Sequence, residues 1–498
     1  MMSWLQAGAG LALMLAGWGY ARHVAKARFP VPLIILLHDA LAPLGTFIVL
    51  LGATGRPLFA GSFAFAAFGG FGFADGVKRA VLREPIVFTD MSEVIELFRH
   101  PRFYLPFAGT GRVLAGMALA VLLFAALFRL EPPLFAVSML QAALWLGGGL
   151  LFIVLLVMLV RPWARLLRRL APSGDALADA RRFGPFAMLG VHGVIARAER
   201  KMRRTNAPVL AVDLPAGCRP PLVLVQSESF FDVRRLGLDD DALPGFAAAV
   251  REAAQWGRLE TACWGANTTR TEFSVLTGLG DGETGFDHFN PYHAFARRLL
   301  PSLAWTLKAQ GYQTVCVHPF DLRFYGRARV MRCLGFDRLV GPEAFTEADR
   351  AGLYVSDAAL ARHCVRLLDE AAGPLFVFAI TMENHGPWVR GAELPVALRG
   401  ADEGEGLGQY LHGLRSSDRM LNILRAGLGA RQGVLGFYGD HMPSLPKGFA
   451  GLNFDETHTD YFLWRAGRGT AMPAPRRDIA AHDMPGQILA LLREAAHD

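Results

Sequence analysis

Three short runs that follow apolar stretches contain the residue types that phosphate chemistry needs: 226–228, 267–269 and 439–441. A carboxylate, a hydroxyl and an Asp-His pair offer oxygen and nitrogen ligands to one divalent cation. The threonine hydroxyl can also act as a nucleophile once a metal activates it. Together these residue types indicate an enzyme that handles phosphate esters.

Each of these residues also has a purely structural interpretation. Glu228 could cap the helix that follows it, and Thr268 or Thr269 could be the N-cap of the amphipathic segment 271–278. An isolated Asp-His pair is more often a loop hydrogen bond than a metal site. The shared placement at the ends of apolar runs nevertheless favours a metal site.

A second group of residues could bind a phosphodiester and its head group. His318, Tyr325 and Arg327 lie within one short stretch of the chain. Arginine can hold phosphate oxygens through paired hydrogen bonds, and histidine can serve as a donor or an acid. His385 follows another apolar run and is a candidate for contacting the phosphoryl group or protonating the leaving oxygen.

The elements that must position these residues alternate between strand-like and helix-like patterns from about residue 220. Short apolar runs bounded by Gly and Pro, and separated by helix-length segments, predict a largely parallel sheet covered by helices, which is an α/β fold. In such sheets ligands bind beyond the carboxyl ends of the strands. The expected strands are 221–225, 313–317, 375–380 and 433–438.

The first 160 of the 498 residues are mostly apolar. Five stretches are long enough to cross a bilayer, which needs about 20 residues. We therefore expect a transmembrane region with about five helices over 1–160, a basic amphipathic linker over 161–206 and a catalytic domain over 207–498. The expected spans are Ser3–Ala21, Val31–Gly52, Pro57–Ala74, Gly111–Phe128 and Leu134–Val160.

The formal net charge of +7 comes largely from arginine, much of it in the linker. Arginines interleaved with apolar residues predict helices that lie on an anionic membrane surface, and no recognition motif supports nucleic-acid binding. Taken alone, the loop charges place the globular part in the cytoplasm by the positive-inside rule.

Within the second span, His38 and Asp39 indicate either a function or a buried pair. The five cysteines lack CxxC spacing and fix neither a disulfide pairing nor a redox compartment.

Taken together and in order, these motifs resemble the lipoteichoic acid synthase-like phosphoglycerol transferases of the alkaline phosphatase and sulfatase superfamily. The resemblance covers the five spans, the linker and nearly all of the globular part, and it implies a sulfatase-like α/β domain after a five-helix membrane region. The matching segments are 228–230, 267–273, 318–327, 384–385 and 439–441.

The resemblance implies one divalent cation, usually Mn2+, with Thr268 both as a ligand and as the catalytic nucleophile. Ligand chemistry leaves Mg2+ or Zn2+ open. Tyr325 stands where many relatives have Trp, and Asp321 is displaced by one position from the usual Asp. The implied metal ligands are Glu228, Thr268, Asp440 and His441. The implied substrate contacts are His318, Tyr325, Arg327 and His385.

The implied reaction is a two-step displacement. Thr268 expels diacylglycerol from the donor, phosphatidylglycerol, and holds the glycerophosphoryl group until an acceptor hydroxyl displaces the threonine. The candidate acceptors are a periplasmic or cyclic glucan, a growing glycerophosphate polymer and another membrane glycolipid, and no residue named above distinguishes them. A composition rich in Ala, Arg and Gly suggests a high-GC bacterium and favours a glucan. Relatives are multi-pass plasma (inner) membrane proteins with an extracytoplasmic catalytic domain, and we follow this resemblance rather than the loop charges.

Four alternatives stay open. A phosphoethanolamine transferase shares the fold and the threonine nucleophile, but usually has a different, Arg-containing motif after its first metal-binding Glu. A phosphodiester hydrolase would use water as the acceptor, and a sulfatase would need a C/S-x-P-x-R motif that is missing at the nucleophile position. A degenerate relative could be a membrane scaffold, which predicts the loss of a ligand or of the nucleophile.

Overall fold

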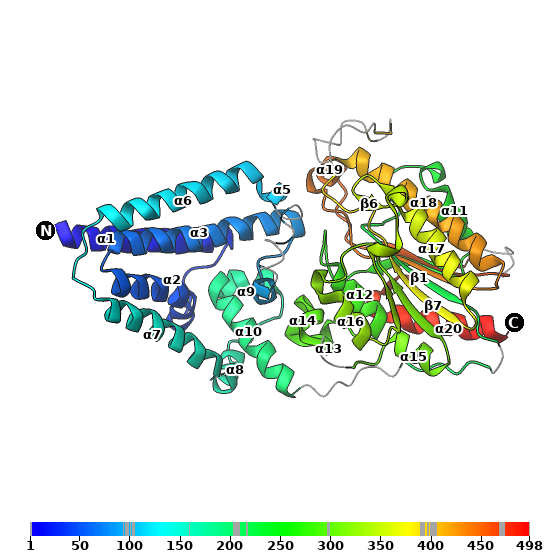
Figure 1. The fold of residues 1–498 in the computed structure, drawn as a ribbon, viewed down its shortest axis with the longest axis horizontal. Helices are drawn as coiled ribbons and strands as arrows, with labels where there is room; N and C mark the ends of the chain where they lie inside the picture. The colour runs from blue at the N-terminus through cyan, green and yellow to red at the C-terminus, as the bar shows by residue number, and fades with distance from the viewer. Residues whose placement is uncertain are drawn as a thin grey trace. The chain divides into compact units, whose positions relative to one another are not determined.

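The computed structural model describes residues 2–92, 94, 99, 101, 105–158, 160–202, 210–215, 218–295, 299–388, 394–395, 398, 406–467 and 474–497. The chain divides into two compact units, Met1–Arg203 and Arg204–Asp498 (Figure 1). The division falls within the predicted linker, whose last residues, 203–206, lie outside the described part of the chain.

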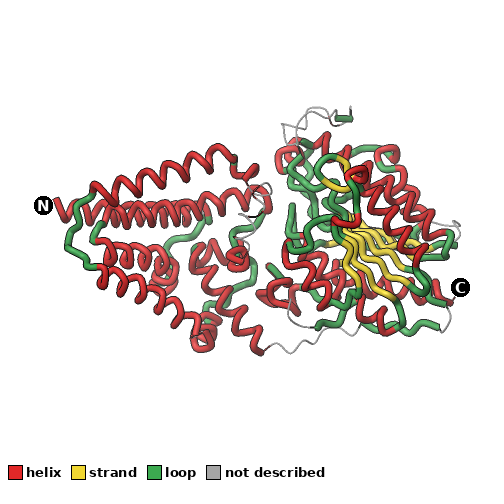
Figure 2. Tube along the Cα trace, in the orientation of Figure 1, coloured by secondary structure: helices red, strands yellow, loops and turns green. Residues whose placement is uncertain are grey.

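The described residues of the first unit form helices and loops (Figure 2). Its longer helices, α1 and α3, pack closely because small residues let the backbones approach. A Cβ on Gly10 would lie 2.2 Å from the carbonyl oxygen of Pro57, and one on Gly61 would lie 2.1 Å from that of Gly10. The helices are α1 (Met2–Val24), α2 (Leu33–Thr54), α3 (Pro57–Leu82), α5 (Leu105–Ala108), α6 (Thr110–Leu130), α7 (Met139–Met158), α8 (Val160–Arg168), α9 (Ala176–Phe183) and α10 (Pro185–Met202), with a 3-10 turn at Phe88–Ser92.

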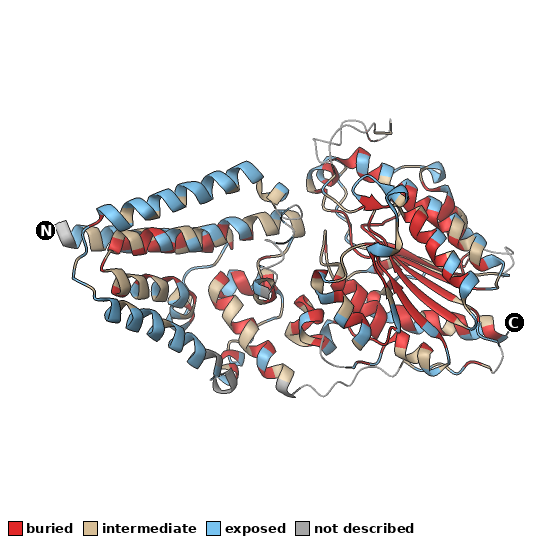
Figure 3. Cartoon of the chain, viewed as in Figure 1, coloured by how far each residue is buried: buried red, intermediate tan, exposed pale blue. Residues whose placement is uncertain are grey.

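Among the described residues, three helices are long and apolar enough to cross a membrane by length and composition: α2, α3 and α6. Met139–Leu155, within α7, is apolar but shorter, and the expected first span lies inside α1. None of the residues of α6 is buried (Figure 3), as expected for a helix whose apolar side chains meet lipid rather than water. Three of the five expected spans therefore have support, and the number five stays a prediction.

Asp39 in α2 joins three helices of the first unit through a buried ion pair. Its Oδ2 accepts hydrogen bonds from Arg22 Nη1 at 2.7 Å and Trp18 Nε1 at 2.8 Å, both on α1. Its Oδ1 accepts the backbone N–H groups of Phe186 and Ala187, at 2.9 Å each, in the first turn of α10. Of the two interpretations of Asp39, the contacts support the buried pair.

The second unit is built on an eight-stranded sheet with the order β10-β2-β9-β8-β1-β7-β3-β4. The central strands β8, β1, β7 and β3 are parallel neighbours, whereas β9 runs antiparallel to both β8 and β2. The strands are β1 (Leu222–Ser227), β2 (Gln255–Glu260), β3 (Gln313–Val317), β4 (Arg338–Val340), β7 (Leu375–Ile380), β8 (Val434–Gly439), β9 (Thr459–Arg465) and β10 (Ile479–Ala480), with a separate hairpin β5 (Arg350–Ala351) and β6 (Tyr354–Val355).

Helices cover both faces of this sheet, so the central strands are buried on both sides (Figure 3). Alternate residues of β1 enter two different hydrophobic cores: Val223 and Val225 enter one, and Leu222 and Leu224 the other. The first core receives α11 (Pro244–Glu252), α17 (Asp357–Glu370) and α18 (Leu407–Gly429). The second receives α12 (Thr268–Thr277), α14 (Pro291–Phe295), α15 (Leu303–Ala309), α16 (Arg327–Cys333) and α20 (Met484–His497); short helices α13 (Asp281–Thr284) and α19 (Pro446–Gly451) complete the unit.

The four strands expected from apolar runs are present as β1, β3, β7 and β8, with ends that differ by no more than two residues. They are the mutually parallel centre of the sheet, which confirms the α/β prediction. The antiparallel strand β9 and its neighbour β2 were not predicted.

Candidate metal and phosphate site

The side chains of Glu228, Asp440 and His441 meet at the carboxyl ends of β1 and β8. Their ligand atoms all lie within 4.8 Å of one another, and the three residues are buried. His441 Nε2 lies 3.6 Å from Glu228 Oε1 and 3.5 Å from Asp440 Oδ2. The register between β1 and β8 explains why these side chains lie close together. Ser227 pairs with Gly439, so the residues that follow the two parallel strands are neighbours.

The turn after β1 is shaped to hold these carboxylates. Ser229 adopts a positive φ of 54°, a region that few non-glycine residues occupy. Its backbone N–H donates to Asp440 Oδ1 and its hydroxyl to Glu228 Oε1, both at 2.8 Å. Gly439 is required beside this turn, since a Cβ there would lie 1.9 Å from the carbonyl oxygen of Phe230.

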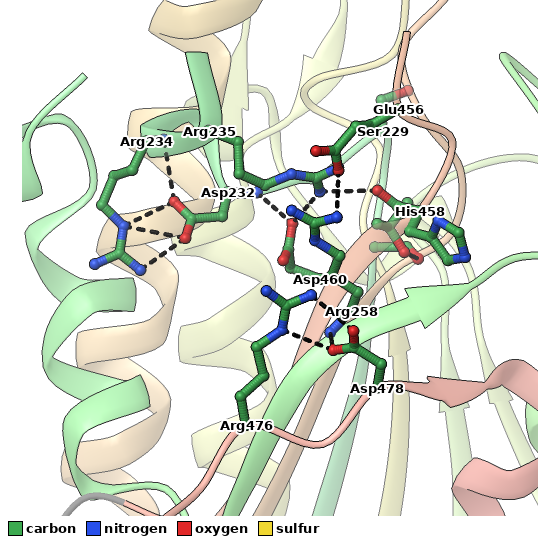
Figure 4. A network of polar contacts seen from close by, with 12 residues as sticks. Ser229, Asp232, Arg234, Arg235, Arg258, Glu456, His458, Asp460, Arg476 and Asp478 are labelled. Carbon is green, nitrogen blue, oxygen red and sulfur yellow. Dashed lines mark hydrogen bonds and ion pairs between the residues drawn. The ribbon is translucent and has the colours of Figure 1, made fainter. Parts of the chain in front are cut away.

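A network of charged side chains fixes the start of β9 to the same turn (Figure 4). Asp460 Oδ2 accepts the backbone N–H of Asp232 and a guanidinium N–H of Arg235, both at 2.8 Å. Arg235 also pairs with Glu456. One residue earlier, the Thr459 hydroxyl donates to the carbonyl oxygen of Gly439 at 2.8 Å, so the network supports both segments that carry metal-ligating side chains.

Thr268 is placed at the cluster by the start of α12. Asn267 adopts a left-handed conformation with φ of 66°, and α12 begins at the next residue. Thr268 Oγ1 lies 3.5 Å from His441 Nε2. The hydroxyl is therefore next to the cluster and at a helix N-terminus, where backbone N–H groups and the helix dipole favour an anionic phosphoryl group.

The electrostatics of the cluster suit a bound cation. Burial raises the pKa of Asp440 to about 7; the charge of His441 opposes this rise, the charge of Glu228 adds to it, and hydrogen bonds from Ser229 and Thr268 oppose it. Burial opposes the charged form of His441, but the charges of Asp440 and Glu228 outweigh it and raise the pKa of this histidine. Neither carboxylate has an Arg or Lys partner within the described part of the chain. A divalent cation would compensate both.

His441 is also oriented as a ligand. Its Nδ1 lies 3.0 Å from the carbonyl oxygen of Met442, which can only accept a hydrogen bond. Nδ1 therefore carries a proton, which leaves Nε2 as the ring nitrogen that can coordinate a cation at the cluster when it is unprotonated. The donor set of two carboxylates, an imidazole and a hydroxyl fits Mn2+, Mg2+ or Zn2+.

The fold also brings together the second predicted group, which includes His318, Tyr325 and Arg327. Arg327 Nη1 lies 2.9 Å from His318 Nε2, and the guanidinium carbon lies 6.0 Å from the centre of the Tyr325 ring. Burial, followed by the charge of Arg327, holds the pKa of His318 well below its usual range, so this histidine is neutral. Tyr325 has a positive φ of 57° within a kinked turn. Asp321 instead pairs with Arg323.

His385 belongs to the turn after β7. Its Nδ1 lies 2.6 Å from the carbonyl oxygen of Gly386, and its ring centre lies 5.9 Å from that of Tyr354. Because β3 and β7 are paired neighbours, His318 and His385 follow adjacent strand ends.

Sequence reasoning gave no role to a carboxylate that the structure places at the centre of the second group. Glu272 is fully buried and accepts hydrogen bonds from Gln226, Tyr292 and Arg327. The signals in the sequence were its position four residues after Thr268 and its place in the matching segment 267–273, but its partners come from distant segments.

Comparison with known proteins relates this arrangement to others. The sulfatase family model matches residues 220–494. The capsular polysaccharide biosynthesis protein RkpI of Rhizobium meliloti (strain 1021) is 32% identical over 456 residues, which cover 86% of this chain and 79% of the relative. A putative cyclic beta-1,2-glucan modification protein of the same organism is 32% identical over 247 residues, covering 47% of this chain and 38% of the relative.

Solved structures are similar in fold. The integral membrane protein lipooligosaccharide phosphoethanolamine transferase A (EptA) from Neisseria meningitidis matches with a TM-score of 0.58 at 13% identity, over 99% of this chain and 95% of its own. The Streptococcus pyogenes phosphoglycerol transferase GacH matches with a TM-score of 0.44 at 21% identity, over 62% of this chain and 84% of its own.

Proposed function

Because the chain belongs to the sulfatase family, we propose that it is a membrane-anchored, metal-dependent phosphoglycerol transferase with Thr268 as the nucleophile. The observation that carries this proposal is the position of the Thr268 hydroxyl. It lies 3.5 Å from His441 Nε2, beside two buried carboxylates and at the N-terminus of α12. Such a hydroxyl is suited to attack phosphorus, because cation and helix terminus both favour the negative charge of the phosphoryl group.

Glu228, Asp440, His441 and Thr268 would hold the divalent cation. When bound, the cation supplies Lewis-acid stabilisation of phosphoryl oxygens and lowers the pKa of the threonine hydroxyl. In the first step a bond forms between Thr268 Oγ1 and phosphorus while the bond from phosphorus to the diacylglycerol oxygen breaks. The threonine gives up its proton, and the diacylglycerol oxygen receives one as it leaves.

In the second step an acceptor hydroxyl forms a bond to the same phosphorus, and the bond to Thr268 Oγ1 breaks. The acceptor loses a proton and the threonine regains one, so the enzyme returns to its starting state. The N-terminus of α12 stays beside the phosphorus throughout, which allows one set of groups to stabilise both steps.

His318, Arg327, Tyr325 and His385 are the proposed contacts of the glycerophosphoryl group. Arg327 donates toward His318 and retains a buried positive charge that attracts phosphate oxygens. Since His318 is neutral with a lowered pKa, we propose that it orients rather than protonates the substrate. His385 is then the better candidate for protonating the leaving oxygen.

Three apolar helices in the first unit would anchor the enzyme in the same bilayer as its lipid donor. We propose an inner-membrane location, an extracytoplasmic catalytic domain over 207–498 and a linker over 161–206 that lies on the membrane surface through exposed arginines such as Arg168, Arg181 and Arg197. The names of two relatives, in capsular polysaccharide biosynthesis and in cyclic glucan modification, support a glycan as the acceptor.

The test is mass spectrometry of the full-length protein in detergent after incubation with Mn2+ and phosphatidylglycerol. We expect a glycerophosphate adduct on the peptide that contains Thr268, and none in Thr268→Ala. Thr269→Ala, which changes the same residue type at the next position, is the matched control and should keep the adduct. Adduct loss on addition of a glucan, with transfer of the label to the glucan, would identify the acceptor.

A parallel incubation with phosphatidylethanolamine tests the main alternative, a phosphoethanolamine transferase. An adduct with the mass of phosphoethanolamine, and none from phosphatidylglycerol, would replace the proposed donor while leaving Thr268 as the nucleophile. An adduct with neither lipid in a protein that binds Mn2+ would contradict the proposal.

A further inference from the structure

Glu272 is the point at which the nucleophile helix and the phosphate-binding group meet. It lies one turn after Thr268 on α12 and is fully buried. Its Oε2 accepts hydrogen bonds from Gln226 Nε2 at 3.0 Å and from Arg327 Nη2 at 3.2 Å. Its Oε1 accepts from Arg327 Nε at 3.4 Å and from the Tyr292 hydroxyl. Four donor groups thus converge on one carboxylate.

The geometry of these contacts fixes the orientation of the guanidinium. Glu272 binds the edge of Arg327 formed by Nε and Nη2, so both carboxylate oxygens meet two nitrogens of one rigid plane. Rotation of that plane would break two hydrogen bonds at once. The remaining nitrogen, Nη1, is thereby held 2.9 Å from His318 Nε2.

This contact also determines the protonation of His318. A guanidinium only donates hydrogen bonds, so His318 Nε2 must be the acceptor. The proton is then on Nδ1, which lies 3.4 Å from the carbonyl oxygen of Ile380. Arg327 has five N–H groups, of which three take part in the contacts with Glu272 and His318. The two others, one on Nη1 and one on Nη2, leave capacity for phosphate oxygens.

The negative charge of Glu272 also compensates the buried guanidinium of Arg327. Arg327 is buried at 3% side-chain exposure, and its partner Glu272 at 0%. A buried guanidinium without a carboxylate would withdraw toward water or disrupt its surroundings. Burial, followed by the charge of Glu272, raises the pKa of Tyr292 well above its usual value, so its hydroxyl remains a donor to the carboxylate.

We infer that Glu272 is a positioning residue that holds Arg327, and through it His318, at a fixed distance from the nucleophile on the same helix. Glu272 itself does not touch the substrate. The inference rests on the proposed function for its effect on rate, because it explains how a phosphoryl group at Thr268 also meets Arg327. An ion pair that only stabilised the fold would have no specific effect on His318 or on transfer.

The experiment compares wild type, Glu272→Gln, Arg327→Gln and the double variant as full-length proteins with Mn2+ and phosphatidylglycerol. Because displacement of a reacting group by about 1 Å can cost about 10²-fold in rate, we expect Glu272→Gln to slow formation of the Thr268 adduct by that order. Arg327→Gln should slow it at least as much, by about 10²- to 10³-fold. The double variant should be no slower than Arg327→Gln, since Glu272 acts through Arg327.

Independent losses that multiply in the double variant would overturn the inference, and so would a wild-type rate in Glu272→Gln. Glu252→Gln, which removes the partner of Arg425 on the other face of the sheet, is the matched control and should keep the wild-type rate. Manganese affinity should be the same in all these variants, which separates positioning from loss of the fold. If Glu272→Gln does not fold, Glu272→Asp retains the charge on a shorter side chain, and a wild-type rate in that variant is equally contrary to the inference.

A second readout does not depend on the donor lipid. In the wild type, nitrogen NMR should show His318 as the neutral form with the proton on Nδ1, and Glu272→Gln should shift this signal as Arg327 moves. If wild type forms no glycerophosphate adduct, the proposed function fails, whereas the His318 signal still decides the role of Glu272. An unchanged signal in Glu272→Gln would show that the two residues are not coupled.

Discussion

Two buried carboxylate clusters in the second unit differ in one respect, which is where their positive charge comes from. Glu272 is paired with Arg327 and supported by neutral donors, so its charge is compensated within the chain. Among the described residues, Glu228 and Asp440 have His441 and hydrogen-bond donors as partners but no Arg or Lys, and burial raises the pKa of Asp440 to about 7 although the charge of His441 opposes the rise. The first cluster has its own guanidinium, whereas the second, with two carboxylates and one histidine, is suited to bind a cation from solution.

The first unit holds another cluster of the compensated kind. Asp39 is fully buried, and its ion pair with Arg22 is reinforced by two backbone N–H groups of α10. Compensated pairs of this type orient helices or side chains and need no ligand. The comparison therefore predicts that disrupting an uncompensated cluster removes activity, while disrupting a compensated one removes stability or positioning.

The largest effect should come from Asp440→Asn. This change removes one of the two charges that attract the cation but keeps the size of the side chain. We expect adduct formation on Thr268 to fall by about 10³-fold or more, together with Mn2+ binding. Asp321→Asn, at an aspartate paired with Arg323, is the control and should behave as wild type in both assays. Full activity in Asp440→Asn would contradict the distinction between a cluster that depends on a bound cation and one that is compensated by an arginine.

Arg22→Met tests the compensated cluster of the first unit, where the comparison predicts a loss of stability rather than of activity. It leaves Asp39 buried without its cation, and the free energy of unfolding should fall by about 3 kcal/mol. The double change Arg22→Met with Asp39→Asn should recover much of this loss, since the uncharged amide oxygen would still accept hydrogen bonds from α10. Denaturant unfolding in detergent measures the loss, and the adduct formed per folded molecule should stay constant. A stable Arg22→Met protein that has lost activity would contradict this view of the pair.

Ser229→Ala should have a smaller effect on the uncompensated cluster. Its hydroxyl orients Glu228 through a 2.8 Å hydrogen bond. Loss of such support to a metal ligand weakens metal affinity by about 10- to 100-fold. The neighbouring Ser227 hydroxyl is buried and has no hydrogen-bond partner among the described residues, so Ser227→Ala is the matched control. Manganese titration by calorimetry should separate the two, and equal affinities would mean that the Ser229 contact does not orient Glu228.

The smallest predicted effect is a pH dependence of the compensated cluster. Burial and Arg327 hold the pKa of His318 below its usual value, so the unfolded chain takes up this proton first as pH falls. The free energy of unfolding should therefore decrease below about pH 6.5, by up to about 1.4 kcal/mol per pH unit. His318→Gln should lack this contribution, and His412→Gln, at an exposed histidine, should keep it. Identical slopes in wild type and His318→Gln would indicate that the pKa of His318 is not lowered in the folded protein.

The centre of the sheet could be predicted because its strands are buried on both faces and read as continuous apolar runs, as in Leu375–Ile380. The strand Gln255–Glu260 has a mixed burial pattern and contains Gln, Gly and Arg, so no period marks it as a strand. Thr459–Arg465 is buried but runs antiparallel, and strand direction depends on connections rather than on composition.

The convergence of Glu228, Asp440, His441 and Thr268 could be predicted because each follows a strand or begins a helix, and neighbouring strand ends lie at one edge of the sheet, while their role as metal ligands stays a prediction. The role of Glu272 could not, because its partners are supplied by tertiary structure. Gln226, Tyr292 and Arg327 are 46, 20 and 55 residues away in the chain. Arg327 illustrates the same point, since its type suggested a phosphate clamp, while its ion pair with Glu272 appears only in the fold.

The measurement that tests the central claim most directly is manganese binding by the full-length wild type, Asp440→Asn and Glu272→Gln under identical conditions. The account predicts one ion per chain in wild type and in Glu272→Gln, and none in Asp440→Asn at the same concentration. Binding that persists in Asp440→Asn, or that disappears in Glu272→Gln, would contradict it, because the cation would then not belong to the cluster that lacks its own positive charge.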